Sequence, residues 1–191
     1  MFRKNSFLLT YSILFFALNC ASFRENNLPI AQESEYKTIK TEKIKVFSRW
    51  TYDTKEPDGV LWAAAHKSWF DKAILESGCC SLVEGPKEAN LVVDGTAFDR
   101  VNHLRIIPLI FSASSLTLIP YWQTMTVDIK VTANKGNKQN KYELRDSFTM
   151  FQWLPMIFLM PFTGTPVTNR DFLFLNTYQN LVIQIKKDGL L

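Results

Sequence analysis

A strict alternation of apolar and polar side chains over residues 124–133 constrains the fold of this 191-residue chain more than any other feature. The apolar members, which are separated by threonine, aspartate or lysine, are Met125, Val127, Ile129, Val131 and Ala133. A period of two is typical of a strand with one buried and one solvent-exposed face. A polar turn at 134–140 and a second alternating segment ending near 150 follow. The sequence therefore predicts a β-hairpin over roughly residues 124–150.

Two strands with a helix between them are predicted before the hairpin. Residues 43–52 and 90–98 are rich in β-branched and aromatic residues, which favour strands. The Leu-Val-Val run in the second of them indicates burial on both faces, as in a parallel crossover unit. Residues 60–77 place apolar side chains at spacings of three and four, which predicts a helix ending at Gly78. The expected buried stripe of this helix is Trp62, Ala65, Trp69, Ala73 and Ser77.

The last predicted element is a C-terminal helix. Thr168 to Asp171 resembles a capping box with aspartate in place of glutamate, and apolar residues at helical spacing continue to Ile185. The predicted fold class is therefore α+β: a four-stranded sheet built as β-α-β, then a β-hairpin, then a helix. Both helices are expected on one face of the sheet.

Two apolar runs flank the hairpin, at residues 106–122 and 153–162. Because the strands of a β-α-β unit are parallel, both runs should leave the same end of the sheet. Neither run reaches the roughly 20 apolar residues of a membrane-spanning helix, and both contain prolines. Three interpretations remain open: a second layer of core, insertion into a membrane interface, or docking of a protein partner or apolar ligand. The candidate contact residues are Phe111, Leu116, Tyr121, Trp122, Trp153, Phe158 and Phe162.

The N-terminus has the organisation of a secretory leader. A short basic segment precedes 13 mostly apolar residues, 6–18, and Cys20 follows shortly after them. This arrangement resembles the lipobox of bacterial lipoproteins, although Asn19 stands where that family usually has Gly, Ala or Ser. The resemblance implies cleavage of residues 1–19 and acylation of Cys20, for example with palmitate. An uncleaved anchor or a plain signal peptide with an incidental cysteine would fit the same residues.

The expected domain organisation follows from the leader. Residues 1–19 form the signal peptide, 20–42 the acylated cysteine and a flexible polar tether, and 43–191 a single domain. Two or three acyl chains would hold such a protein stably on a membrane.

A second resemblance covers residues 90 to 165. The segments 115–122 (SLTLIPYW) and 153–162 (WLPMIFLMPF), separated by a polar hairpin and preceded by 90–95 (NLVVDG), are similar to a pattern in small membrane-associated bacterial lipoproteins of unknown function. The resemblance implies a location in the cell envelope, facing the periplasm or the cell surface. It implies no catalytic residue.

Few residues suggest chemistry. Cys79 and Cys80 are adjacent and could form a vicinal disulfide in an oxidising compartment, pair with another chain, or stay reduced. His66 and His103 have no neighbouring nucleophile motif, so we interpret both as structural. No His or Cys set has metal-ligand spacing, and we expect neither a metal nor another cofactor.

The charge balance argues against nucleic acid as a partner. The net charge is +4, and without Arg3 and Lys4 of the leader 20 basic side chains would face 18 acidic ones. The sequence therefore predicts a non-enzymatic envelope lipoprotein, an interaction or accessory component that contacts membrane lipid or an envelope protein. The alternative is a periplasmic binding module for an apolar, lipid-like ligand.

Overall fold

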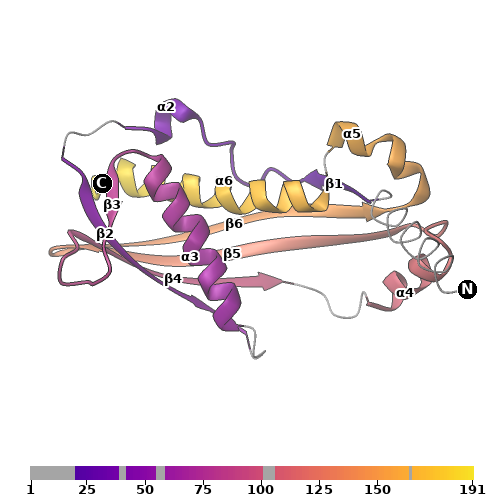
Figure 1. Cartoon of the computed structure of the whole chain (residues 1–191), viewed down its shortest axis with the longest axis horizontal. Coiled ribbons are helices and arrows are strands. Elements are labelled where there is room, and N and C mark those ends of the chain that lie inside the picture. The colour runs from indigo at the N-terminus through magenta and orange to yellow at the C-terminus, as the bar shows by residue number, and fades with distance from the viewer. Residues whose placement is uncertain (1–19, 39–41, 55–58, 101–105, 164) are drawn as a thin grey trace, which may run out of the picture. The chain divides into compact units, whose positions relative to one another are not determined.

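The computed structural model describes residues 20–38, 42–54, 59–100, 106–163 and 165–191. The fold is α+β, with a mixed sheet of six strands in the order β1-β6-β5-β4-β2-β3. The elements (Figure 1) are β1 (Cys20–Arg24), α2 (Glu33–Tyr36), β2 (Ile44–Tyr52), α3 (Gly59–Glu76), β3 (Cys80–Leu82), β4 (Leu91–Arg100), α4 (Ile106–Ser114), β5 (Tyr121–Lys135), β6 (Lys138–Gln152), the 3-10 helix η2 (Leu154–Phe158), α5 (Met160–Thr163) and α6 (Pro166–Lys187). The signal peptide predicted at 1–19 lies outside the described residues.

The sheet has two strands more than the four predicted. The missed strands, β1 and β3, have five and three residues and pair only at the two edges of the sheet. Segments this short show no recognisable alternation, so only their pairing identifies them. The predicted parallel relation of the first two long strands is confirmed, because Val46 to Tyr52 of β2 run parallel to Leu91 to Ala97 of β4.

The chain divides into two compact units. Unit 1 comprises residues 20–25, 106–125 and 147–171 within the described ranges. Unit 2 comprises residues 26–100, 126–146 and 172–191. The long strands β5 and β6 each contribute one part to either unit.

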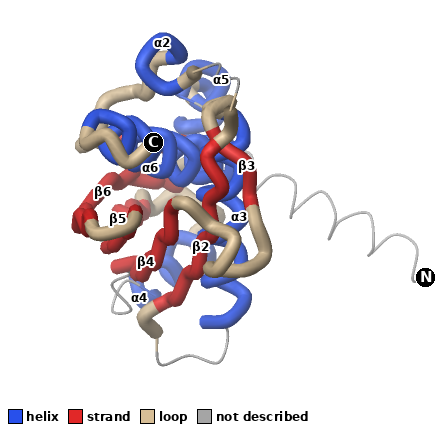
Figure 2. Tube along the Cα trace, turned by 90° about the vertical axis from the view of Figure 1, so that its left-hand side faces the viewer, coloured by secondary structure: helices blue, strands red, loops and turns tan. Residues whose placement is uncertain are grey.

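The core of unit 2 lies between one face of its strands and two helices. Trp50 of β2 is buried, and its ring contacts Phe70 of α3 and Tyr178 of α6 at centroid distances of 5.4 and 5.0 Å. The two helices therefore cover the same face, as predicted and as Figure 2 shows for β2 and β4. Val127, Ile129, Val131 and Ala133 are buried, which confirms the predicted register of β5.

Two details of the predicted helices are wrong. In α3 the buried residues are His66, Phe70, Ala73 and Ile74, whereas Trp62, Ala65 and Trp69 stay partly exposed. The stripe is rotated because the large Trp rings reach the core from the flank, where Trp69 stacks on Phe174 at 4.0 Å.

The cap of α6 lies three residues earlier than predicted. The backbone N–H of Thr168 donates to Oγ1 of Thr165, and the backbone N–H of Thr165 donates to Oγ1 of Thr168. This reciprocal pair satisfies two backbone donors at the helix start, and Pro166 occupies the first helical position, where proline is favoured.

Residues 20–38, the described part of the predicted flexible tether, contain a strand and a short helix. β1 pairs antiparallel with β6, with Cys20 opposite Gln152 and Arg24 opposite Phe148. Ser22 is buried, and its carbonyl oxygen accepts a hydrogen bond of 2.9 Å from Nδ2 of Asn169. The sequence does not predict β1, because its buried residues are Ala21 and Ser22, which give no apolar periodicity.

The later part of the same segment is also ordered, within unit 2. Tyr36 at the end of α2 is buried, and its hydroxyl donates to the carbonyl oxygen of Ala73 at 2.5 Å. Lys187 Nζ lies 3.6 Å from a carboxylate oxygen of Glu35.

Candidate functional site

Unit 1 exposes most of the apolar residues that the sequence singled out. Phe111, Phe158 and Phe162 are 60%, 78% and 87% exposed, large values for phenylalanine in a folded chain. We define the apolar surface as the exposed residues Phe111, Leu116, Leu118, Trp122, Trp153, Phe158 and Phe162. Tyr121 is the exception among the predicted contact residues. It is 3% exposed, and its hydroxyl donates to Oε1 of Gln123 at 2.6 Å.

The first run exposes several large apolar side chains and buries two of its hydroxyl side chains. Ser112 and Thr117 are both fully buried, and Oγ of Ser112 donates to the carbonyl oxygen of Ile119 at 2.8 Å. Their neighbours Phe111, Leu116 and Leu118 point outward. In a protein that faces water, apolar side chains are usually buried and hydroxyl side chains exposed, and here the two are reversed. Such an arrangement suits a segment that faces an apolar environment.

The turn after α4 holds Leu116 and Thr117 in the left-handed region, with φ of 53° and 63°. The backbone N–H of Thr117 donates to the carbonyl oxygen of Ser112 at 2.8 Å, which is the six-to-one bond of a Schellman cap. Glycine usually occupies the position of Leu116 in this motif, because a side chain there is strained. The turn therefore accepts strain in order to place a leucine side chain on the surface.

The two apolar runs meet in unit 1. The backbone N–H of Leu154, which follows Trp153, donates to the carbonyl oxygen of Thr117 at 3.0 Å. At their base, the Phe151 ring stacks on Trp122 and meets Phe23 of β1 edge-on, at centroid distances of 5.8 and 6.2 Å. Both runs therefore lie at the same end of the sheet, as predicted, since the first leads into Tyr121 of β5 and the second follows Gln152 of β6.

Exposure of the apolar surface decides against the core interpretation for these residues. The hollow lined by Pro108, Pro120, Tyr121 and Trp122 has a volume of about 180 Å³. Binding sites for small ligands usually offer about 300–1,000 Å³. These residues form an exposed apolar surface on unit 1.

Cys20 lies beside this surface. It is the first residue of β1 and pairs with Gln152, the residue before Trp153. β1 also contacts η2 and α5, the two short helices of the second run. The Cys20 side chain is half-buried, and burial raises the pKa of its thiol.

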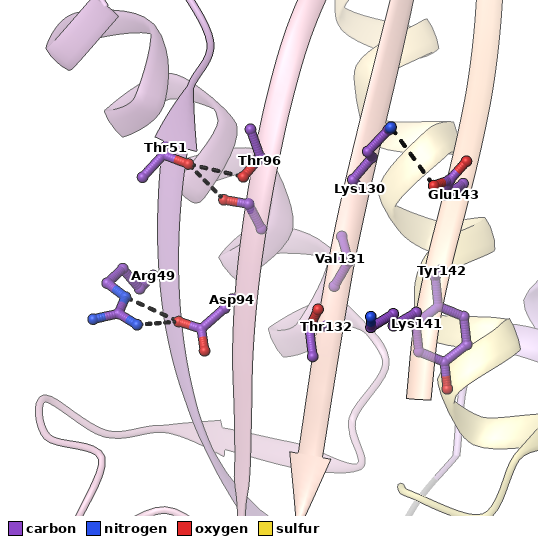
Figure 3. Close-up of a pocket in the computed structure, with 11 residues that line it drawn as sticks. Arg49, Thr51, Asp94, Thr96, Lys130, Val131, Thr132, Lys141, Tyr142 and Glu143 are labelled. Carbon is purple, nitrogen blue, oxygen red and sulfur yellow. Dashed lines mark hydrogen bonds and ion pairs between the residues drawn. The ribbon is translucent and has the colours of Figure 1, made fainter. Parts of the chain in front are cut away.

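Unit 2 contains a polar groove on the sheet face opposite its helices (Figure 3). The groove has about 640 Å³, and ion pairs cross it between neighbouring strands. Arg49 Nη2 lies 2.8 Å from Oδ1 of Asp94, and Lys130 Nζ lies 3.7 Å from Oε1 of Glu143. Exposed pairs of this kind contribute little to stability and keep a strand face solvated. The sequence predicts Lys130 and Glu143 on the outward side of their strands. It could not pair these residues across strands, because the strand order decides which residues become neighbours.

His66 is a buried titratable group of unit 2 with a strongly lowered pKa. It is fully buried, with Nδ1 2.7 Å from the hydroxyl of Tyr178 and rings of Tyr52, Trp69 and Phe174 around it. Burial lowers the pKa of His66 to about 4, so the imidazole is neutral at physiological pH. The enclosing rings give it a structural role, whereas His103 lies outside the described residues.

The vicinal pair Cys79 and Cys80 forms a disulfide. Both cysteines are buried between the end of α3 and the start of β3, and the Cys79 carbonyl accepts a hydrogen bond from the backbone N–H of Ile44. Of the three possibilities open from the sequence, the structure adopts the intrachain bond.

Two further properties concern the part of the chain that the structure describes. Within it, no helix is both long and apolar enough to cross a membrane. Among the same residues, no group of three or more His, Cys, Asp or Glu side chains is placed to hold a metal ion.

Comparison with known proteins gives only distant structural likenesses. No family model matches the chain, and no curated protein matches it. A PelC dodecamer from Paraburkholderia phytofirmans is 9% identical, with a TM-score of 0.37 over 84% of this chain and 96% of that one. The hypothetical protein CT253 from Chlamydia trachomatis is 12% identical, with a TM-score of 0.39 over 78% and 96%. A Caulobacter crescentus chain provisionally described as a lipoprotein is 10% identical, with a TM-score of 0.25 over 75% and 87%. At such low scores these likenesses place no residue of this chain in a functional role.

Proposed function

We propose that this protein is an exported lipoprotein of the bacterial cell envelope, held on a membrane through acylated Cys20. It acts without catalysis of its own, as an interaction or accessory component. The apolar surface of unit 1 makes the contact, with membrane lipid or with an envelope protein.

The observation that carries this proposal is the inverted burial of the first apolar run. Ser112 and Thr117 are buried while Phe111 and Leu116 are exposed, at the cost of left-handed backbone at Leu116. A chain that met only water on this side would gain by exchanging these positions, because apolar burial contributes about 25 cal/mol per Å².

Metabolic labelling tests the anchor. The full chain is expressed in a bacterial host with an alkyne analogue of palmitate, beside Cys20→Ala. We expect label on the parent and none on Cys20→Ala, whereas a Cys79→Ala, Cys80→Ala double variant keeps its label.

The outcomes separate the interpretations of the leader. Label retained by Cys20→Ala would contradict acylation at that residue. A parent that stays unlabelled but sediments with membranes would indicate an uncleaved anchor, and one released in soluble form would indicate a plain signal peptide.

A further inference from the structure

We infer that the apolar surface enters the same membrane leaflet that holds the Cys20 anchor, so that unit 1 is attached at two points with no tether between them. This inference rests on the proposed function and names its partner: a lipid bilayer, with no protein required.

The position of the anchor is the first argument. Cys20 is the first residue that the structure describes, and it is already paired with Gln152 in the sheet. Cys20 thus lies opposite Gln152 in the sheet, and Gln152 directly precedes Trp153, where the second apolar run begins. Strands of a sheet lie about 4.8 Å apart, so acyl chains on Cys20 would begin beside Trp153, within the thickness of a headgroup layer.

The connection between anchor and surface is also firm. Besides its ladder with β6, β1 is held by Asn169, whose Nδ2 donates to the carbonyl oxygen and to Oγ of Ser22 at 2.9 and 2.6 Å. On the following residues the Glu25 carboxylate accepts hydrogen bonds from Ser147 and Thr149. A flexible tether would allow the apolar surface to turn away from the membrane. The paired strand β1 instead holds Cys20 and the apolar surface in a fixed orientation relative to each other.

The chemistry of the surface favours lipid over an acidic or basic partner. Residues 106–122 and 153–163 contain no charged side chain. Trp122 and Trp153 flank the exposed Phe residues, and tryptophan is enriched where a protein crosses from headgroups into acyl chains. The described residues of unit 1 carry two basic and two acidic side chains: Arg24, Glu25, Arg170 and Asp171. Insertion should therefore be apolar in origin and indifferent to anionic lipid and to salt.

Spin labelling of the full chain tests this geometry. Phe158→Cys and Phe111→Cys each create one accessible thiol in the acylated protein, because Cys20 carries the acyl group and Cys79 and Cys80 are joined and buried. Lys141→Cys, on the polar face of unit 2, is the matched control. Each labelled protein is reconstituted into phosphatidylcholine vesicles, and collision of the label with oxygen and with a water-soluble nickel chelate is measured.

We expect labels at positions 111 and 158 to collide with oxygen at least several-fold more than with nickel, and the label at 141 to show the reverse. The result should be unchanged at high salt and with anionic lipid added. High nickel accessibility at 111 and 158 would overturn the inference in favour of solvent. Low accessibility to both reagents would overturn it in favour of a protein contact.

The experiment also separates this inference from the anchor on which it rests. A protein that floats with vesicles but keeps positions 111 and 158 in water retains its anchor and lacks the second attachment. A protein that does not float at all overturns both.

Discussion

The backbone N–H of Leu154 donates to the carbonyl oxygen of Thr117 at 3.0 Å, which joins two apolar segments that lie 37 residues apart in sequence. Thr117 follows the strained Leu116, and Leu154 follows the exposed Trp153. The hydrogen bond therefore links the two halves of the apolar surface at their base. It makes their orientation a property of the fold and not of two independent loops.

Substitutions at Leu116 distinguish an effect on the stability of the turn from an effect on membrane contact. Leu116→Gly and Leu116→Ala both remove the exposed leucine side chain, but only glycine relieves the left-handed strain at φ 53°. We expect the glycine variant to be more stable than the alanine variant by about 1 kcal/mol, measured by urea unfolding.

Vesicle flotation of the same two variants should fall equally, because they lose the same side chain. A glycine variant that unfolds earlier than the alanine variant would contradict the left-handed turn. A difference in flotation between them would show that stability, and not the side chain, governs the contact.

Trp50 packs directly on Gly95, its partner across the β2–β4 ladder. A Cβ added at Gly95 would lie 2.4–2.6 Å from three atoms of the Trp50 ring, which no side chain tolerates without movement of the core. We expect Gly95→Ala to destabilise the protein by about 1–3 kcal/mol or more.

Gly85→Ala is the control for that substitution, since its Cβ would meet nothing within 4 Å. The double variant Trp50→Leu, Gly95→Ala should lose less stability than the sum of the two single variants, because the clash is absent once the Trp50 ring is removed. Additive losses in this double variant would mean that the two residues are not in contact.

The register of β5 can be tested with neighbouring substitutions on opposite faces. Val127 is 2% exposed, so Val127→Asp would place an unpaired carboxylate in the core and should cost about 3 kcal/mol or more. Thr126→Asp lies on the open face and should cost less than about 1 kcal/mol. Thermal unfolding of both variants measures the difference, and equal losses would show the strand shifted by one residue.

Acid sensitivity should follow His66. Its pKa of about 4 in the folded protein lies below the ordinary value of about 6.5, so the unfolded chain binds a proton that the folded chain excludes. The stability contributed by the neutral ring is present above pH 6.5 and is lost as pH falls from 6.5 to 4, by roughly 3 kcal/mol in total. Urea unfolding across this range measures the slope.

His66→Leu supplies the comparison, because carboxylates titrate alike in both proteins. The leucine variant should lose less stability between pH 6.5 and 4 than the parent does, whatever its stability at pH 7. Identical slopes would place the His66 pKa near its ordinary value and contradict the burial argument.

The sequence alone determined the elements that have a period. Val127, Ile129 and Val131 alternate with polar neighbours and are buried, because a half-covered strand needs one apolar face. The helical segments at 59–76 and 166–187 were likewise recognisable, and so was the unusual apolar character of residues 106–122. Each of these signals is local, since it depends on side chains within a few residues of one another.

Only the tertiary structure decided where partners from distant segments meet. β1 forms a strand because it pairs with the edge of β6 and because Asn169 and Thr149 hydrogen-bond to Ser22 and Glu25. The residues Ala21 and Ser22 carry no local signal that predicts a strand. The same holds for the placement of His66 among four aromatic rings and for the outward orientation of Phe111 and Phe158. An apolar residue can be buried or exposed with the same local sequence. Whether such a residue is buried depends on whether the fold supplies neighbours that cover it. In unit 1 the fold covers Ser112 and Thr117 and leaves Phe111 and Phe158 exposed.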